Sequence, residues 1–418
     1  MTEIEKLNIS ESLKLFEDGK KLIPGGVLGI RRPYNFVEGE YPIFVESGKG
    51  GRIIDVDGNE FIDFLCAYGP IILGYREEEI DEAVIKQIRD KGFCFSITQR
   101  YQNQLAEKFK ELIPCSEMTI FVKTGSDATT TAIRLARAYT KKIKIMRCGY
   151  HGWHDWCVEV KGGIPEKLYE DVYEFHYNDL NSLEDLMSRH GSETAAIILT
   201  PFGHPLAQKL EEPKPGFLEG VKTISEKYST VLIFDEIRTG FRLSLGGAQK
   251  YYGITPDLAC FGKAMANGYS ISAVTGRTDI MKTGEKEVFI SSTFFPNSQP
   301  YIASLKTIEI LERENVLEKI WEKGGRFFGK VKKVIENSNV GAELSGIAPM
   351  FFITFKKDAQ KIYKEKRKSF YTQLIRKGVF MQPYHHGYIA YRHTEDDLDN
   401  TVIAIEEAIS YIQDKFTQ

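Results

Sequence analysis

The chain has 418 residues, of which 42% are hydrophobic and 27% are charged. This is the composition of a globular protein without disordered or fibrous bias, and the length allows a large core with one or two smaller domains. The net charge of −3 argues against a broad nucleic-acid-binding face.

The six cysteines and the distribution of apolar residues predict where the protein works. No two cysteines form a CxxC pair, and none stands at zinc-finger spacing from a histidine. The charged N-terminal stretch lacks the apolar centre of a secretion signal. No apolar run approaches the roughly 18 residues of a membrane span. We therefore expect a cytoplasmic protein with reduced thiols, no bound metal, and no membrane or nucleic-acid partner.

The first predicted elements are a short helix and a hairpin. Apolar residues at helical spacing predict a helix over residues 9–22, which Pro24-Gly25-Gly26 ends. Alternating residues on both sides of Asp57-Gly58 predict a β-hairpin over residues 51–64. We assign residues 1–66 to an N-terminal segment.

Short apolar runs alternate with helical stretches through the middle of the chain. The runs cover residues 143–146, 195–199, 230–234, 258–261 and 271–274. Such strands, separated by helices, are typical of a mostly parallel sheet covered on both faces. Long charged helices follow, with a strand from Met350 to Phe355. The pattern predicts an α/β protein with a large domain over 67–305 and a small α+β domain over 306–418.

Two of these predicted strands end in residues that suit one cofactor. Asp235 follows the run 230–234, and Lys263 follows Gly262 at the end of the run 258–261. Ligand-binding groups collect at the carboxyl ends of strands in such sheets. A desolvated lysine has a lowered pKa and can form an imine, while an acid can keep a ring nitrogen protonated. Although a lone acid after a strand is more often a cap, the pair predicts pyridoxal phosphate held by Lys263 as a Schiff base.

A third element offers an anion site. Gly125 and Ser126 precede a strongly helical stretch over residues 129–139. A helix N-terminus presents backbone N–H groups and a positive dipole end, which suit a phosphate. Serine and aspartate are also favoured as plain helix caps, so this turn alone does not establish a phosphate site.

The segment after the run 143–146 carries aromatic residues between glycines. Tyr150 stands where its ring could stack on a flat cofactor, or could simply be buried in a turn. His151 and His154 have no third metal ligand at a recognisable spacing. We therefore interpret these histidines without a metal.

Together and in this order, these motifs resemble the class III aminotransferases of the fold-type-I pyridoxal-phosphate enzymes. The nearest subgroup is the one named for glutamate-1-semialdehyde aminomutase. The resemblance runs from about Leu22 to the C-terminus. Its motifs are Pro24-Gly25-Gly26-Val27 with Arg32, Asp55-Val56-Asp57-Gly58, Tyr68-Gly69-Pro70, Thr124-Gly125-Ser126-Asp127-Ala128, Arg134-Leu135-Ala136-Arg137, Tyr150-His151-Gly152, Asn178-Asp179, Phe234-Asp235-Glu236, Gly240-Phe241-Arg242, Pro256-Asp257-Leu258, Gly262-Lys263 and Gly276-Arg277.

The resemblance implies a large cofactor-binding domain around a seven-stranded sheet, and it implies roles for single residues. Lys263 would form the Schiff base and shuttle the proton, and Asp235 would pair with the pyridinium nitrogen. Thr293 matches a threonine that reaches the phosphate from the neighbouring subunit, which predicts a homodimer with shared active sites. The predicted cofactor-binding residues are Gly125, Ser126, Tyr150, His151, Asp235, Ile237, Lys263 and Thr293, with Ile237 and Tyr150 on opposite faces of the ring.

At the substrate end the sequence departs from the subgroup. Arg32 matches the arginine that meets a substrate carboxylate. Where relatives often have Glu-Pro-Val and then Gly-Asn, this chain has Thr200-Pro201-Phe202-Gly203-His204, and residues 292–298 also differ. The predicted substrate-binding residues are Arg32, Tyr68, His204 and His385.

These departures predict an aminotransferase whose substrate is not glutamate semialdehyde. The resemblance to the subgroup implies a β- or ω-amino compound as the donor, such as a β-amino acid, a 3-aminoacyl thioester or an amino sugar. The expected acceptor is a keto acid such as 2-oxoglutarate. The alternatives are glutamate-1-semialdehyde 2,1-aminomutase or another pyridoxal-phosphate isomerase, and a non-catalytic regulator with this fold.

Overall fold

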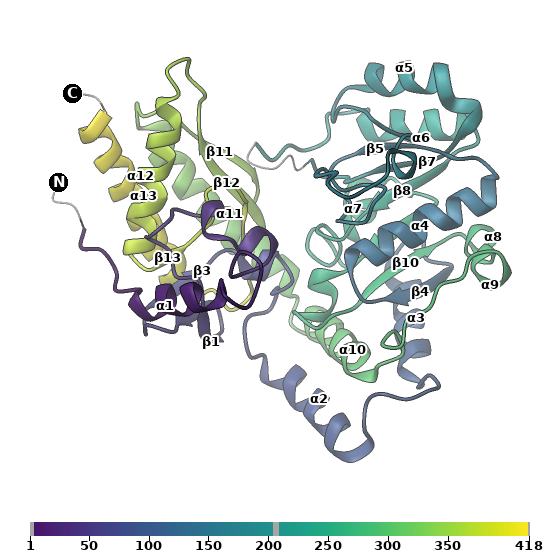
Figure 1. Ribbon diagram of the computed structural model, residues 1–418, viewed down its shortest axis with the longest axis horizontal. Helices are drawn as coiled ribbons and strands as arrows, with labels where there is room; N and C mark the ends of the chain where they lie inside the picture. The colour runs from purple at the N-terminus through teal and green to yellow at the C-terminus, as the bar shows by residue number, and fades with distance from the viewer. Residues whose placement is uncertain (1–3, 204–208, 417–418) are drawn as a thin grey trace. The chain divides into compact units, whose positions relative to one another are not determined.

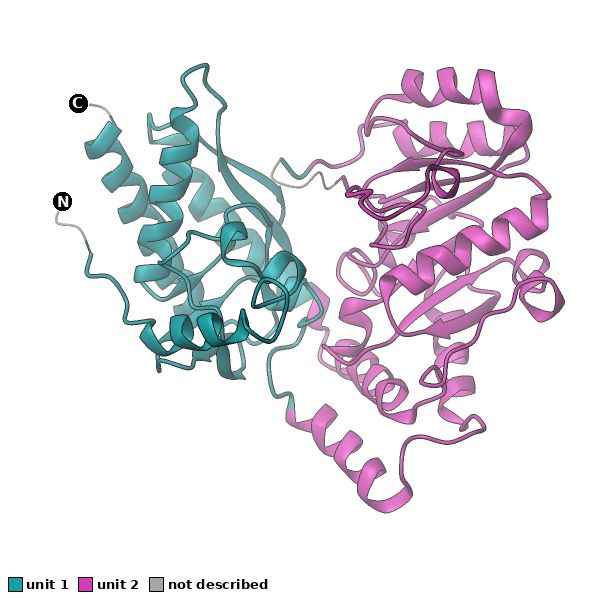
Figure 2. Ribbon diagram, in the orientation of Figure 1, with its two compact units in different colours: residues 1–77, 206–210, 318–418 teal, residues 78–205, 211–317 magenta. Residues whose placement is uncertain are grey.

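The computed structural model describes residues 4–203 and 209–416, which form two compact units (Figures 1 and 2). Unit 1 holds the described residues of 1–77, 206–210 and 318–418, and unit 2 those of 78–205 and 211–317. Across the described ranges, none of the helices has both the length and the apolar character needed to span a bilayer.

Unit 2 is built on a seven-stranded sheet in the order β4-β10-β9-β8-β7-β5-β6 (Figure 1). β10 runs antiparallel to both β4 and β9, and the remaining pairs are parallel. The mostly parallel sheet predicted from the sequence is confirmed. Its strands are β4 (Met118–Val122), β5 (Lys144–Cys148), β6 (Val172–Glu174), β7 (Thr194–Leu199), β8 (Val231–Asp235), β9 (Leu258–Phe261) and β10 (Ser272–Gly276).

Helices cover this sheet because its central strands are apolar on both faces. Every residue of β7, β8 and β9 is buried. α4 packs against β7, β8, β9 and β10, and its buried alanines, isoleucine and leucine join the core of the unit. The helices are α2 (Glu78–Lys91), α3 (Tyr101–Leu112), α4 (Gly125–Thr140), α5 (Leu180–His190), α6 (Phe217–Lys227), α7 (Gly247–Tyr252), α8 (Thr278–Met281), α9 (Thr283–Lys286) and α10 (Ser298–Arg313).

Unit 1 contains a four-stranded sheet, β1-β2-β3-β13, and a three-stranded sheet, β11-β12-β14. The predicted hairpin is confirmed, since β2 and β3 pair antiparallel, and β13 adds to β3 in parallel. The N-terminal and C-terminal parts of the chain thus share one sheet, while the domain boundaries at residues 66 and 305 stay a prediction. The elements are α1 (Ser10–Gly19), β1 (Val45–Lys49), β2 (Arg52–Asp55), β3 (Glu60–Asp63), most of α11 (Val316–Glu336), β11 (Ala342–Ile347), β12 (Met350–Phe355), α12 (Ile362–Arg376), β13 (Val379–Phe380), β14 (Gly387–Tyr388) and α13 (Glu395–Phe416).

A strained turn follows β3. Cys66, Ala67 and Tyr68 all have positive φ, of 48°, 52° and 69°, a conformation that non-glycine residues adopt only when their surroundings impose it. The carboxylate of Asp63 provides that constraint. It accepts hydrogen bonds from the N–H groups of Leu65 at 2.7 Å and Cys66 at 3.1 Å. The turn that carries Tyr68 is therefore held by one buried acid.

Candidate active site

Lys263 stands directly after β9, in a backbone conformation that fixes its direction. Gly262 is extended, and Lys263 then has a φ of +46° and opens a 3₁₀ turn over Lys263–Ala266. A Cβ on Gly262 would lie 2.6 Å from Ser272 Oγ, so only glycine fits there without displacing its neighbour. The positive φ at a lysine marks a position that its surroundings hold in place.

The amine of Lys263 is tuned toward its neutral form. The pKa of Lys263 falls to about 7, mainly because the amine is desolvated. The positive charge of Arg238 lowers this pKa further, Asp235 raises it, and Arg242 lowers it by a smaller amount. A lysine in this state can act as a nucleophile and can exchange protons near neutral pH.

Asp235 ends the neighbouring strand and is held from two sides. β8 and β9 are parallel, with Asp235 opposite Cys260, so Asp235 and Lys263 leave the sheet at the same edge. The Oδ2 atom of Asp235 lies 2.8 Å from His151 Nδ1, and Oδ1 accepts a hydrogen bond from the N–H of Ile237 at 3.1 Å. The carboxylate is buried, and each oxygen retains acceptor capacity for a further donor.

His151 is itself fixed in place. Its ring stacks on Trp156 with an interplanar angle of 8° and centroids 6.3 Å apart, and its carbonyl accepts a hydrogen bond from Thr129 Oγ1 at 2.7 Å. In the neutral imidazole with its proton on Nδ1, Nε2 is an acceptor. Within the described ranges, buried Nε2 has no hydrogen-bond partner, which is the kind of atom that a bound group can satisfy.

The N-terminus of α4 forms an anion cradle. Thr124 caps it: Thr124 Oγ1 accepts from Asp127 N at 3.1 Å, and Asp127 Oδ2 accepts from Thr124 N at 2.8 Å. Ser126 is buried, and its Oγ accepts a hydrogen bond from Trp153 N at 3.2 Å, which leaves its proton for another acceptor. The first N–H groups of a helix have no intrahelical acceptor, so a phosphate suits this turn.

Ile237 connects the cradle to the lysine. A Cβ on Gly125 would lie 3.1 Å from one methyl group of Ile237, and a Cβ on Gly262 would lie 3.2 Å from the other. Both glycines therefore let Ile237 pack directly against the backbone on each side of it. Tyr150 is 45% exposed, and its pKa is raised, mainly by desolvation and also by charges that include Asp235. Predicted cofactor residues from β5, α4, β8 and β9 thus gather at one edge of the sheet.

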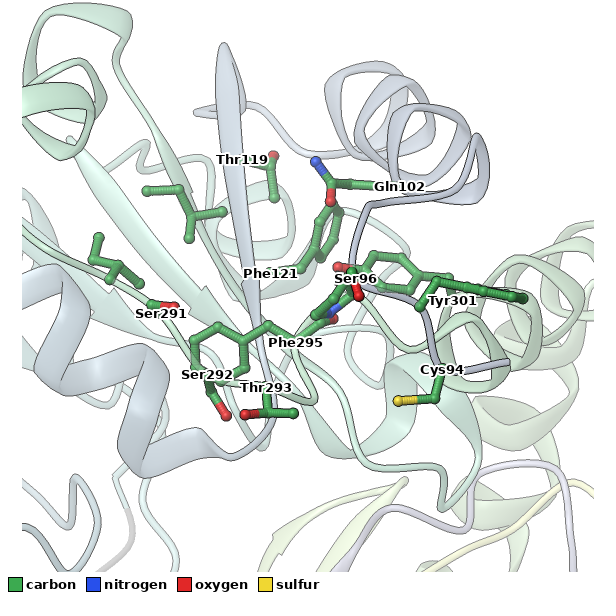
Figure 3. A pocket seen from close by; sticks show the side chains of 14 residues that line it. Cys94, Ser96, Gln102, Thr119, Phe121, Ser291, Ser292, Thr293, Phe295 and Tyr301 are labelled. Carbon is green, nitrogen blue, oxygen red and sulfur yellow. Dashed lines mark hydrogen bonds between the residues drawn. The ribbon is translucent and has the colours of Figure 1, made fainter. Parts of the chain in front are cut away.

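Thr293 lies elsewhere in unit 2. It is exposed and lines an open hollow of 680 Å³ that no other predicted cofactor residue lines. In Figure 3, Ser291, Ser292 and Thr293 lie on one side of this hollow, with Ser96, Tyr301 and Cys94 on the other. The hollow is lined by Cys94, Phe95, Ser96, Gln102, Thr119, Ile120, Phe121, Ile290, Ser291, Ser292, Thr293, Phe295, Pro296 and Tyr301.

The predicted substrate residues belong to unit 1, except for His204, which lies outside the described residues. Tyr68 and His385 contact each other edge to face, with ring centroids 5.2 Å apart. The Nε atom of Arg32 donates to Val27 O at 3.3 Å. These residues and the cofactor residues therefore belong to separate compact units.

Reasoning from the sequence missed three residues of the site. Arg238 and Arg242 are buried, and their charges act on Lys263. The sequence pattern indicated Arg242 only as a member of a motif, without a role. Trp156 supports the His151 ring. Their place in the segments that follow β8 and Tyr150 was the only signal, since an arginine or tryptophan in a loop is usually interpreted as exposed or as core.

The residues present fit pyridoxal phosphate. The fit rests on a desolvated amine, a buried carboxylate beside an unsatisfied histidine nitrogen, and a helix N-terminus with a buried serine. These groups match the cofactor's aldehyde, its ring nitrogen side and its phosphate.

Comparison with known proteins agrees with this fit. The family model "Aminotransferase class-III" matches residues 34–409. The chain is 62% identical, over 98% of its length and 99% of the relative's, to 3-aminobutyryl-CoA aminotransferase of Cloacimonas acidaminovorans (strain Evry). It is 33% identical, over 97% of its length and 99% of the relative's, to glutamate-1-semialdehyde 2,1-aminomutase of Methanosphaera stadtmanae.

A solved structure confirms the fold. The FumI protein of Sphingopyxis sp. MTA144, in its PLP internal aldimine form, is 30% identical and superimposes with a TM-score of 0.92 over 97% of both chains. The architecture is the fold-type-I transferase fold predicted from the sequence. The chain belongs to the class III aminotransferases and is a pyridoxal-phosphate-dependent aminotransferase.

Proposed function

We propose that this aminotransferase takes its amino group from a 3-aminoacyl thioester of the 3-aminobutyryl-CoA type and passes it to a keto acid such as 2-oxoglutarate. One observation carries the proposal: the chain is 62% identical, along essentially its whole length, to a 3-aminobutyryl-CoA aminotransferase. The donor is one of the candidates that the resemblance to the subgroup implies.

The residues of unit 2 support the chemistry of such a transfer. Bound pyridoxal phosphate supplies an electron sink for the carbon that carries the amino group. Lys263 Nζ takes the proton from that carbon and returns it at the other end of the transfer, for which its pKa near 7 is suited. Asp235 would face the ring nitrogen, and the hydrogen bond with His151 fixes the direction of that carboxyl group.

Binding is divided among the other predicted cofactor residues. The N-terminus of α4 and the Ser126 hydroxyl would hold the phosphate, while Ile237 and Tyr150 would contact opposite faces of the ring. A thioester has no free carboxylate, whereas 2-oxoglutarate has two. Arg32 therefore serves the keto acid.

The test is a donor half-reaction followed in the visible spectrum. Purified holoenzyme is mixed, without acceptor, with 3-aminobutyryl-CoA, free 3-aminobutanoate, an amino sugar or glutamate semialdehyde. We expect the yellow band to bleach fastest with the thioester and to return when 2-oxoglutarate is added. Lys263→Ala is the control and should show no turnover. Preference for free 3-aminobutanoate or the amino sugar over the thioester would refute the proposed donor.

The second candidate is an aminomutase, because relatives about one third identical carry that name. An aminomutase returns the amino group to the same molecule, so no acceptor is consumed. Conversion of glutamate semialdehyde to aminolevulinate at an enzymatic rate would favour this candidate. Accumulation of the amine form of the cofactor with thioester alone would favour the aminotransferase.

We also propose a homodimer whose active sites are completed by Thr293 of the partner chain. The resemblance supports this, as do two exposed apolar side chains near Thr293 along the chain, since Phe289 and Phe294 are 82% and 58% exposed. Mixing Lys263→Ala with Thr293→Ala subunits tests it. A hybrid has one site with both residues intact, so wild-type cofactor affinity should return in that site. Hybrids with no recovered site would refute shared sites.

The proposed location is the cytoplasm. None of the six cysteines forms a disulfide in the described structure, and five of them are buried, as is usual in a reducing compartment.

A further inference from the structure

Two adjacent arginines in unit 1 are placed without acidic partners. The guanidinium carbon of Arg31 lies 5.7 Å from the centre of the Tyr68 ring, a cation–π contact. Arg32 donates from Nε to Val27 O. Within residues 4–203 and 209–416, no carboxylate lies within 4.0 Å of either guanidinium, although most other arginines of unit 1 are paired. Two unpaired positive charges side by side favour an anionic ligand.

The backbone that carries these arginines is fastened to the strained turn. Tyr68 Oη donates to Ile30 O at 3.0 Å, and Gln382 Nε2 donates to Tyr68 Oη at 3.4 Å. Gly25 lies beneath the guanidinium of Arg32, where a Cβ would come within 3.2 Å of Nε. The arginines are thus held on a built surface, which reduces the entropy lost when a ligand binds.

Apolar side chains border the arginines. Leu28, Ile30 and Tyr34 are 66%, 49% and 64% exposed, within seven consecutive residues. A small keto acid binds through its carboxylates and needs little apolar surface. A charged group carried on a long, largely uncharged arm matches this combination better. The carrier of an acyl thioester, with phosphates at the end of a pantetheine arm, has that chemistry.

We infer that the segment Leu28–Tyr34 binds the carrier of the thioester substrate, with a carrier phosphate at Arg31, while Arg32 takes the carboxylate of the keto acid. This rests on the proposed function, since it assumes a thioester donor. Arg31 thereby distinguishes the thioester from the free β-amino acid, and the adjacent arginine serves the second substrate of the same enzyme.

The experiment compares three donors with the same 3-aminobutyryl group: the coenzyme A thioester, the 4′-phosphopantetheine thioester and the pantetheine thioester, which has no phosphate. In Arg31→Gln we expect kcat/KM for coenzyme A thioester to fall about tenfold, with no change for the pantetheine thioester or in the KM for the keto acid. Arg32→Gln should raise the KM for the keto acid. Arg326→Gln is the matched control, because that exposed arginine already pairs with Glu322 and Glu395.

The phosphopantetheine thioester shows which phosphate Arg31 binds. A loss shared with coenzyme A places the pantetheine phosphate there, and a loss confined to coenzyme A places the nucleotide phosphates there. Binding of coenzyme A alone, measured by calorimetry, should weaken in Arg31→Gln by the same factor, without any turnover.

Failure of this inference is separable from failure of the proposed function. Wild-type enzyme that does not react with any thioester removes the proposed function. Wild-type enzyme that reacts, while Arg31→Gln leaves all three thioesters unchanged or slows all three equally, removes only the carrier site.

Discussion

The desolvated lysine gives a stability prediction that does not depend on catalysis. The pKa of Lys263 falls from 10.5 to about 7. At ~1.4 kcal/mol for each unit, keeping this amine in the folded protein at pH 7 costs at most ~4 kcal/mol. Lys263 keeps some contact with solvent, so screening leaves an expected cost of about 2–4 kcal/mol. Lys263→Met, which keeps the length of the side chain, should therefore stabilise the cofactor-free protein at pH 7.

The way the stability difference between the wild type and Lys263→Met changes with pH tests the desolvation argument. The unfolded chain keeps its proton on this lysine up to pH 10.5, whereas the folded chain releases it near pH 7. The wild-type protein should therefore gain stability from this group between pH 7 and 10.5, and its deficit relative to Lys263→Met should shrink over that window.

Urea unfolding of both cofactor-free proteins at pH 7, 9 and 10.5 measures the difference. Lys110→Met, at an exposed position of α3, is the control and should show no such trend. Equal stabilities at pH 7, or a gap that stays constant with pH, would refute the desolvation argument. A constant gap would mean that methionine simply packs better.

Two further predictions concern other positions. Gly152 has a φ of +120°, and a Cβ there would overlap Ser126 Oγ. Gly152→Ala should therefore weaken cofactor binding by tenfold or more in an absorbance titration. The control is Gly163→Ala, at a position with a φ of +80° and open space around it, which should leave the cofactor affinity unchanged; equal losses in both variants would contradict a specific overlap. Burial lowers the pKa of His393 to about 4. The protein should therefore lose up to ~3 kcal/mol of stability as pH falls from 6.5 to 4. Urea unfolding should show that this loss is absent in His393→Gln, and the same pH profile in the wild type and the variant would contradict the prediction.

The strands of the large sheet were predictable from single apolar runs. The five predicted runs correspond to β5, β7, β8, β9 and β10 within one or two residues. β4 and β6 were not predicted, because their uninterrupted apolar runs cover only residues 120–122 and 172–173, and β6 is a three-residue edge strand. The antiparallel direction of β10 was also missed, because a run of buried residues reads the same in both directions.

The site was predictable where chain order alone brings residues together. Parallel strands place their carboxyl ends at one edge, so Asp235 and Lys263 follow from the pattern. The bond between Asp235 and His151 joins residues 84 positions apart and depends on tertiary packing. The positive charge of Arg238 beside Lys263 has the same origin. The roles assigned to these residues stay predictions until cofactor binding is measured.

Asp63, which holds the turn after β3, affects both folding and substrate selectivity. Desolvation raises the pKa of Asp63 to about 6, against three hydrogen bonds that lower it, one of them from Tyr75 Oη at 2.5 Å. A change at Asp63 releases Tyr68, and through Tyr68 it releases the backbone that carries Arg31. New substrate preferences should therefore arise by exchange of exposed side chains over Leu28–Tyr34, with Asp63 left untouched. Libraries for altered donors are best confined to that surface.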